Sequence, residues 1–236
     1  MVARLPGKMQ PCAAMTQSPL ATVEVETSAN PTRSVIWLHG LGADGHDFEP
    51  AVPYLVRPGG PAPRFVFPHA PVRPVTLNGG LPMRAWYDIA ALQRRAAQDE
   101  AGIRRADAAV RALIRRENER GVATGHIVLA GFSQGGAMAL YTGTRLAEKL
   151  AGVVGLSCYN LLAEHFATER HAANQDTPFL LAHGTQDPVV LPEMGEESRT
   201  QLVAAGYQVE WHSYPMGHSV CAEELAVIAA FLARVL

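Results

Sequence analysis

The sequence predicts an α/β fold with a mostly parallel central sheet and helices on both faces of that sheet. From residue 34 onward, short apolar and β-branched runs alternate with longer segments of helical periodicity. This order requires crossover connections and therefore parallel strands. The 236-residue chain is 48% hydrophobic and 18% charged, so it can bury a full core within one domain.

The strands are expected at roughly residues 34–39, 63–68, 125–130, 151–157, 178–183 and 207–214, where valine, isoleucine, leucine and aromatic residues cluster. Before them, residues 22–26 read Thr-Val-Glu-Val-Glu, an alternation typical of an edge strand.

The helices follow from apolar spacing. A long helix is expected between residues 98 and 120, where the apolar positions fall on one face and arginine and glutamate on the other. A final helix is expected from Glu223 to Leu236. Only about 20 residues separate the strands at 151–157 and 178–183, including one short helical stretch at 161–172, so we expect no inserted cap domain.

Composition excludes several classes of protein. The net charge of −2 gives no basic surplus for nucleic acid, and no apolar stretch approaches the roughly 20 residues of a membrane helix. We therefore expect no nucleic-acid partner and no stable membrane insertion. An odd number of cysteines, without metal-ligand spacing, argues against a disulfide framework or a zinc site and fits a cytoplasmic location: Cys12, Cys158 and Cys221.

Residues 131–135 read Gly-Phe-Ser-Gln-Gly and stand between a predicted strand and helix-prone residues from Ala137 onward. A serine between two glycines at a strand-to-helix turn is the context of a nucleophile elbow. The glycines permit the sharp turn that lifts the Ser133 hydroxyl to the carboxyl edge of the sheet. The same five-residue pattern also occurs in ordinary glycine-rich turns. The assignment of Ser133 as a nucleophile therefore depends on other segments at that edge.

Residues 39–42, His-Gly-Leu-Gly, follow the strand at 34–39. A serine that attacks a carbonyl carbon creates an oxyanion, which needs backbone N–H donors already in place. One donor comes from the residue after the serine and the other from a glycine-rich loop after an earlier strand. We therefore expect the N–H groups of Leu41 and Gln134 to form the oxyanion hole, although a His-Gly pair after a strand can also be only a turn.

An acid follows the serine at the expected place. Asp187 lies in the loop after the strand at 178–183, whereas Asp176 precedes that strand and falls at the opposite edge of a parallel sheet. The chain order serine, acid, histidine is that of α/β-hydrolases. Asp187 is therefore the expected acid, although Asp187-Pro188 alone could be a simple turn initiator.

The expected base is His218, which lies in the loop after the strand at 207–214, whereas His212 lies within that strand. His218 would take the proton of Ser133. Asp187 would fix the tautomer of the imidazole and stabilise the imidazolium.

With these motifs, the sequence resembles the carboxylesterase and acyl-protein thioesterase family of α/β-hydrolases over about residues 33–236. The resemblance rests on five collinear segments, at 39–48, 84–88, 131–136, 183–190 and 216–219. It implies the α/β-hydrolase fold, a triad of Ser133, Asp187 and His218, and an oxyanion hole from Leu41 and Gln134. Its members hydrolyse short to medium carboxylic esters, and some cleave acyl thioesters of proteins or lysophospholipids. The chain departs from the family pattern at residues 157–161 and 191–192, which concerns substrate preference rather than chemistry.

The longest irregular segment, from Pro68 to Pro82, is expected to form a short lid and one wall of an open acyl groove. Leu77 and Trp86 would be its apolar contributors. Trp86 fits a core position equally well, and Val190 is a further candidate for the groove.

Residues 1–30 are expected to be an N-terminal extension to a single catalytic domain of the α/β-hydrolase fold over residues 31–236. Arg4 and Lys8 are followed by no continuous apolar run, so a secretory signal is not expected. Met15 can serve as an alternative start, and the residues up to 14 are expected to be dispensable.

The sequence thus predicts a serine carboxylesterase that hydrolyses short- to medium-chain esters through an acyl-enzyme, without cofactor or metal ion. Its partner would be a small-molecule ester or acyl-thioester substrate, and a homodimer is left open. The alternative is an acyl-protein thioesterase or lysophospholipase. A non-catalytic protein that holds a ligand in the same fold would normally have a damaged triad, whereas this one is complete.

Overall fold

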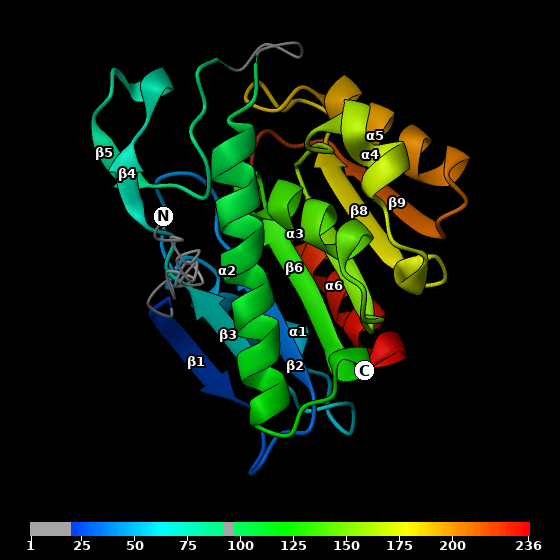
Figure 1. Cartoon of the computed structure of the whole chain (residues 1–236). Coiled ribbons are helices and arrows are strands. Elements are labelled where there is room, and N and C mark those ends of the chain that lie inside the picture. Colours follow the sequence, from blue (N-terminus) through cyan, green and yellow to red (C-terminus); the bar gives the residue numbers. More distant parts are fainter. Residues whose placement is uncertain (1–19, 92–96) are drawn as a thin grey trace, which may run out of the picture.

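The computed structural model of the chain describes residues 20–91 and 97–236 and centres on a seven-stranded sheet (Figure 1). The strand order is β1-β3-β2-β6-β7-β8-β9. One edge strand, β1 (Thr22–Glu26), pairs antiparallel with β3 (Arg64–Pro68), and every other pair in this sheet is parallel. The parallel strands are β2 (Ser34–Leu38), β3, β6 (Ile127–Phe132), β7 (Gly152–Leu156), β8 (Phe179–Gly184) and β9 (Val209–Tyr214). The predicted strands and the edge strand are confirmed.

Helices cover both faces of the sheet, as predicted (Figure 1). Alternate side chains of β2 enter different cores: Ile36 and Leu38 pack on one face, Val35 and Trp37 on the other. The first face is covered by α2 (Glu100–Glu119), α3 (Gln134–Arg145), α4 (Ala163–Glu169) and α5 (Pro192–Ala204), and the second by α1 (Val52–Leu55) and α6 (Ala222–Val235). Short 3-10 turns occupy Glu49–Ala51 (η1), Thr124–His126 (η3) and Ala172–Asn174 (η4). Over the described ranges, none of these helices is long and apolar enough to cross a bilayer.

The long helix α2 begins and ends where its flanking residues require. The Asp99 side chain caps the first turn by accepting a hydrogen bond from the Gly102 N–H at 2.8 Å. Beyond the last turn, Gly121 takes a φ of +90°, which ends the helix without side-chain strain. The apolar positions that predicted this helix face the sheet: Ile103, Val110, Leu113 and Ile114 are all buried.

The segment from Pro68 to Pro82, expected to be irregular, instead contains part of a small antiparallel hairpin. β4 (Val72–Pro74) pairs with β5 (Pro82–Arg84), and η2 (Thr76–Asn78) lies between them. Each strand has only three residues and carries a proline, so no alternation of apolar and polar residues marks it in the sequence. The hairpin is anchored at its tip, because Thr76 donates hydrogen bonds to the Asp88 carboxylate from its N–H at 2.7 Å and its hydroxyl at 2.6 Å.

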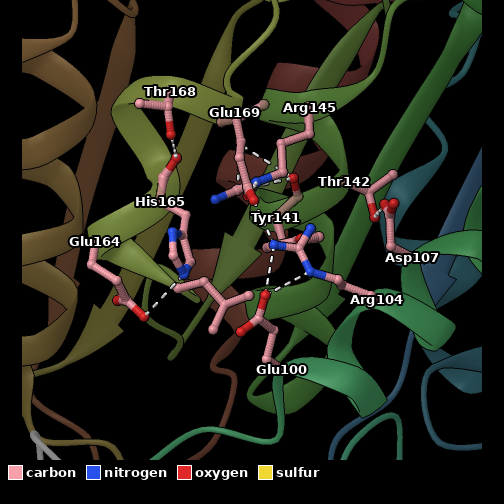
Figure 2. Close-up of polar contacts among 12 residues, drawn as sticks. Glu100, Arg104, Asp107, Tyr141, Thr142, Arg145, Glu164, His165, Thr168 and Glu169 are labelled. Carbon is pink, nitrogen blue, oxygen red and sulfur yellow. Dashed lines mark hydrogen bonds and ion pairs between the residues drawn. The ribbon is translucent and has the colours of Figure 1, made fainter.

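Ion pairs fasten the α4 region to the body of the domain (Figure 2). Glu169 at the end of α4 binds Arg104 of α2 at 2.5 Å and Arg145 of α3 at 2.8 Å. The Thr142 hydroxyl of α3 donates a hydrogen bond to Asp107 of α2 at 2.7 Å. These contacts hold the connection between β7 and β8 against the body of the domain. This connection contains only α4 and η4, with no inserted cap domain among its residues.

The N-terminal extension expected over residues 1–30 is described only from residue 20 onward. Residues 1–19, which include the 14 expected to be dispensable, lie outside the described residues. Within the extension expected over residues 1–30, β1 belongs to the sheet, pairing from Thr22 opposite Pro68 to Glu26 opposite Arg64.

Glu224, in the first turn of α6, is a fully buried carboxyl group without an ion-pair partner among the described residues, and only the backbone of Cys221 acts to lower its pKa. Burial raises its pKa to about 7. The folded protein therefore keeps this proton at pH values where the unfolded chain has lost it, so stability falls as the pH rises from about 4.5 to about 7 and then levels off.

Glu224→Gln keeps the shape of the side chain and removes this titration. We expect urea denaturation at pH 8 to find the variant more stable than the wild type, by up to about 3 kcal/mol. At pH 4 the difference is expected to vanish, since both side chains are then neutral. A gain of the same size at both pH values would contradict a titrating Glu224.

Candidate active site

Ser133 lies at the sharp turn between β6 and α3. Its φ of +54° and ψ of −121° are rare for a residue with a side chain. The turn requires both flanking glycines, since a Cβ on Gly131 would overlap the backbone of Gly135, and a Cβ on Gly135 would overlap the Leu38 carbonyl. The Ser133 N–H is bound to the Leu156 carbonyl at 2.8 Å. This is the strained geometry of a nucleophile elbow.

Loops after two other strands bring His218 and Asp187 to the same edge of the sheet. The Nε2 atom of His218 lies 2.9 Å from the Ser133 Oγ, and its Nδ1 lies 2.7 Å from an Asp187 carboxylate oxygen. With the Nδ1 proton donated to the carboxylate, Nε2 is free to accept the serine proton. The Phe132 ring packs beside the imidazole at 4.8 Å between centroids. The structure thus brings together the three side chains expected from the sequence.

The Asp187 carboxylate is buried, and both of its oxygens form hydrogen bonds. Its Oδ1 accepts hydrogen bonds from the N–H groups of Val189 at 2.8 Å and Val190 at 3.0 Å, and its Oδ2 faces His218. Sequence reasoning overlooked His183, whose Nε2 lies 2.8 Å from the Val190 carbonyl oxygen and 3.5 Å from Asp187 Oδ2. His183 thereby ties the far end of the Asp187 loop to β8. The position of His183 at the carboxyl end of β8, the edge where the other site residues lie, is the sequence feature that could have identified it.

The two expected oxyanion donors lie on the wall of the cavity that holds Ser133 and His218. Gln134 is the first residue of α3, so its N–H has no carbonyl partner one turn earlier in the helix. The Gln134 side chain is held in place by two hydrogen bonds with backbone groups of neighbouring residues on another segment. Its Oε1 accepts a hydrogen bond from the Trp86 N–H at 2.8 Å, and its Nε2 donates to the Tyr87 carbonyl at 2.8 Å.

Trp86 corrects one expectation, because it does not contribute a wall to the cavity. Its side chain is 2% exposed and packs in the core between the sheet and α2 and α3, and Trp86 is not among the residues that line the cavity. The indole N–H donates to the His39 carbonyl oxygen at 2.9 Å. Burial lowers the pKa of His39, which favours the neutral ring whose Nε2 accepts the Ala70 N–H at 3.0 Å. Trp86 therefore supports the loop that carries Leu41.

Trp86→Ala is expected to destabilise the protein by about 3–5 kcal/mol, because it leaves a large cavity in the core. Trp86→Phe keeps an aromatic ring and removes the hydrogen bond to His39, for an expected loss of about 1–2 kcal/mol. Urea denaturation of both variants measures these losses. A Trp86→Ala protein of unchanged stability but altered acyl-chain preference would restore Trp86 to the cavity wall.

The cavity beside Ser133 has a volume of about 280 Å³, near the lower end of the roughly 300–1,000 Å³ that is usual for small-molecule sites. Leu77 from the β4–β5 hairpin and Val190 from the Asp187 loop line it, as expected. Leu77 is 42% exposed, whereas Val190 is buried. The apolar lining is suited to an acyl chain.

Cys158 is a further nucleophilic residue near this edge, but its thiol is buried. Burial raises the pKa of the thiol, so the reactive thiolate is disfavoured. The sulfur lies where side chains on Gly136 or Gly155 would collide with it. Cys158 therefore fills a gap in the packing, whereas the Ser133 hydroxyl opens onto the cavity.

The chain is similar in sequence and fold to known proteins. A family model described as phospholipase/carboxylesterase matches residues 20–236. The chain is 42% identical over 217 residues to the acyl-protein thioesterase 1 of Neurospora crassa, covering 88% of this chain and 89% of that protein. It is 39% identical over 223 residues to the acyl-protein thioesterase 1 of Yarrowia lipolytica, covering 91% and 96%. The crystal structure of Zea mays acyl-protein thioesterase 2 matches with a TM-score of 0.81 at 31% identity, covering 91% of this chain and 98% of that one.

Proposed function

The chain belongs to the phospholipase/carboxylesterase family of α/β-hydrolases, and on this premise we propose that it is an acyl-protein thioesterase that uses Ser133, His218 and Asp187. The observation that carries the proposal is the continuous hydrogen-bonded series from Ser133 through His218 to Asp187 at the wall of an apolar cavity. The names of the relatives support a thioester substrate over the carboxylic ester expected from the sequence.

In this proposal, the Ser133 oxygen attacks the thioester carbonyl carbon while His218 Nε2 takes its proton. The N–H groups of Leu41 and Gln134 bind the resulting oxyanion. Collapse of this intermediate breaks the carbon–sulfur bond, and His218 returns the proton to the departing cysteine sulfur. An acyl-enzyme remains on Ser133. A water molecule activated by His218 then hydrolyses it, which releases the fatty acid and restores the serine.

The same machinery acts on oxygen esters, so carboxylesterase activity is a second candidate function. The modest volume of the cavity favours it, because about 280 Å³ suits an acyl chain of short to medium length. The two substrates differ in the leaving group. A cysteine thiol has a pKa of about 8.5 and leaves more readily than an alkoxide, so a thioester makes less demand on proton donation by His218.

The two functions can be separated with matched peptides that carry the same acyl chain on cysteine sulfur or on serine oxygen. Mass spectrometry would follow deacylation of each, with Ser133→Ala protein as the blank. We expect kcat/KM for the thioester to exceed that for the oxygen ester by about ten-fold or more after correction for uncatalysed hydrolysis, equivalent to at least ~1.4 kcal/mol of transition-state stabilisation. Cleavage of the oxygen ester alone would establish the carboxylesterase instead.

A further inference from the structure

The active-site cavity shares a wall with a second cavity of about 400 Å³. Tyr159, from the segment between β7 and α4, lines both. Ala97 and Gln98, which precede α2, and Met194 of α5 also line both cavities. These residues form the partition between the two spaces, and Tyr159 contributes its largest side chain.

The two cavities differ in chemistry. The first presents mainly apolar side chains around Ser133, among them Leu77, Ile89 and Val190. The second is lined by carboxyl, amide and hydroxyl groups, contributed by Glu100, Asn160, Glu164, Ser198 and Gln201. An alkyl chain that entered the second cavity would displace water from these polar groups without replacing their hydrogen bonds, which is unfavourable. The partition therefore separates a space suited to an acyl chain from one that is not.

Hydrogen bonds of the residues just after Tyr159, and of its own hydroxyl group, hold the partition in place. The next residue, Asn160, donates from its N–H to the Ser198 hydroxyl oxygen at 2.8 Å and from its side chain to Gln201 at 3.0 Å. Gln98 accepts the Leu162 N–H at 2.8 Å. The Tyr159 hydroxyl itself lies 3.4 Å from that of Tyr87. The ring is thus anchored through its backbone neighbours and its own hydroxyl group.

We propose that Tyr159 forms the closed end of the acyl compartment and so sets the longest acyl chain that the enzyme accepts. This rests on the proposed function, in which the acyl group occupies the cavity beside Ser133. The ring blocks the path toward the second cavity. Removing the ring adds the space of the phenol to the apolar cavity beside Ser133, so a longer chain fits there without strain.

The test is a chain-length profile of p-nitrophenyl esters, from butyrate to hexadecanoate, for wild type, Tyr159→Ala, Tyr159→Leu and Tyr159→Phe. In both truncated variants, the ratio of kcat/KM for dodecanoate to that for butyrate is expected to rise by about ten-fold or more, since even one methylene in an apolar pocket changes discrimination by roughly 10–200-fold. Tyr159→Phe keeps the ring, so its ratio should stay within about two-fold of wild type. Two truncations are used so that poor folding of one leaves the other informative.

An unchanged ratio in a truncated variant that melts like the wild type would overturn the assignment of Tyr159. The assignment would also be overturned if Tyr159→Phe produced the same rise in the ratio, since loss of the hydroxyl group rather than of the ring would then be responsible. The profile is measured only on hydrolysis that Ser133→Ala abolishes. Hydrolysis that persists in Ser133→Ala would instead refute the proposed function, so the two failures are distinguishable.

Discussion

Ser133→Ala is expected to reduce thioester and ester hydrolysis by several orders of magnitude, because nucleophile and base act as a unit. The change removes one oxygen atom that binds His218 Nε2 at 2.9 Å and leaves the backbone of the elbow in place. Stability should therefore stay close to that of the wild type. Steady-state rates on a chromogenic ester, with denaturation curves alongside, measure both effects.

Ser213→Ala is the matched control, since Ser213 is an exposed serine on β9. It should keep wild-type activity. If Ser133→Ala retained more than a few per cent of the wild-type rate after purification from endogenous esterases, Ser133 would not be the nucleophile.

Asp187→Asn is expected to lower kcat by about 10³–10⁴-fold with the fold intact. The asparagine oxygen can still accept the N–H groups of Val189 and Val190, which preserves the loop. Its amide nitrogen then faces His218 Nδ1 in place of the carboxylate oxygen. Because two donors cannot share a hydrogen bond, the imidazole is driven to the tautomer that places its proton on Nε2, and it can no longer accept the proton of Ser133.

Asp176→Asn provides the comparison, because Asp176 precedes β8 at the opposite end of that strand from Asp187. It should leave kcat near the wild-type value. A large loss in Asp176→Asn with little change in Asp187→Asn would show that the acid has been assigned to the wrong residue.

The framework of the fold could be predicted because burial on both faces leaves a clear signal in the sequence. Strand β6, for example, is an uninterrupted apolar run that leads directly into the elbow, and its neighbours β7 and β8 are similar. Ser133, Asp187 and His218 each follow a parallel strand, so all three could be placed at the same edge of the sheet. Local signals of this kind are sufficient for residues whose roles depend on where strands end.

The parts that could not be predicted depend on contacts between distant segments. The three-residue strands β4 and β5 lack periodicity and are defined only by their pairing with each other. Trp86 and Leu77 are nine residues apart on the chain and are both apolar, yet Trp86 is fixed in the core by His39 while Leu77 lines the cavity. Tyr159 likewise gains its place between two cavities from α5 and from the residues before α2, which no pattern around residue 159 reveals.

The role of Ser133 as nucleophile is tested most directly by locating the residue that a fluorophosphonate probe modifies. A serine activated by a histidine reacts with such a probe, whereas an ordinary hydroxyl group does not. After labelling, digestion and mass spectrometry, we expect one adduct on the peptide that contains Ser133, with deacylation lost in proportion to labelling and no adduct on Ser133→Ala protein. An adduct on Cys158, or full deacylation activity after complete labelling of Ser133, would contradict this role of Ser133.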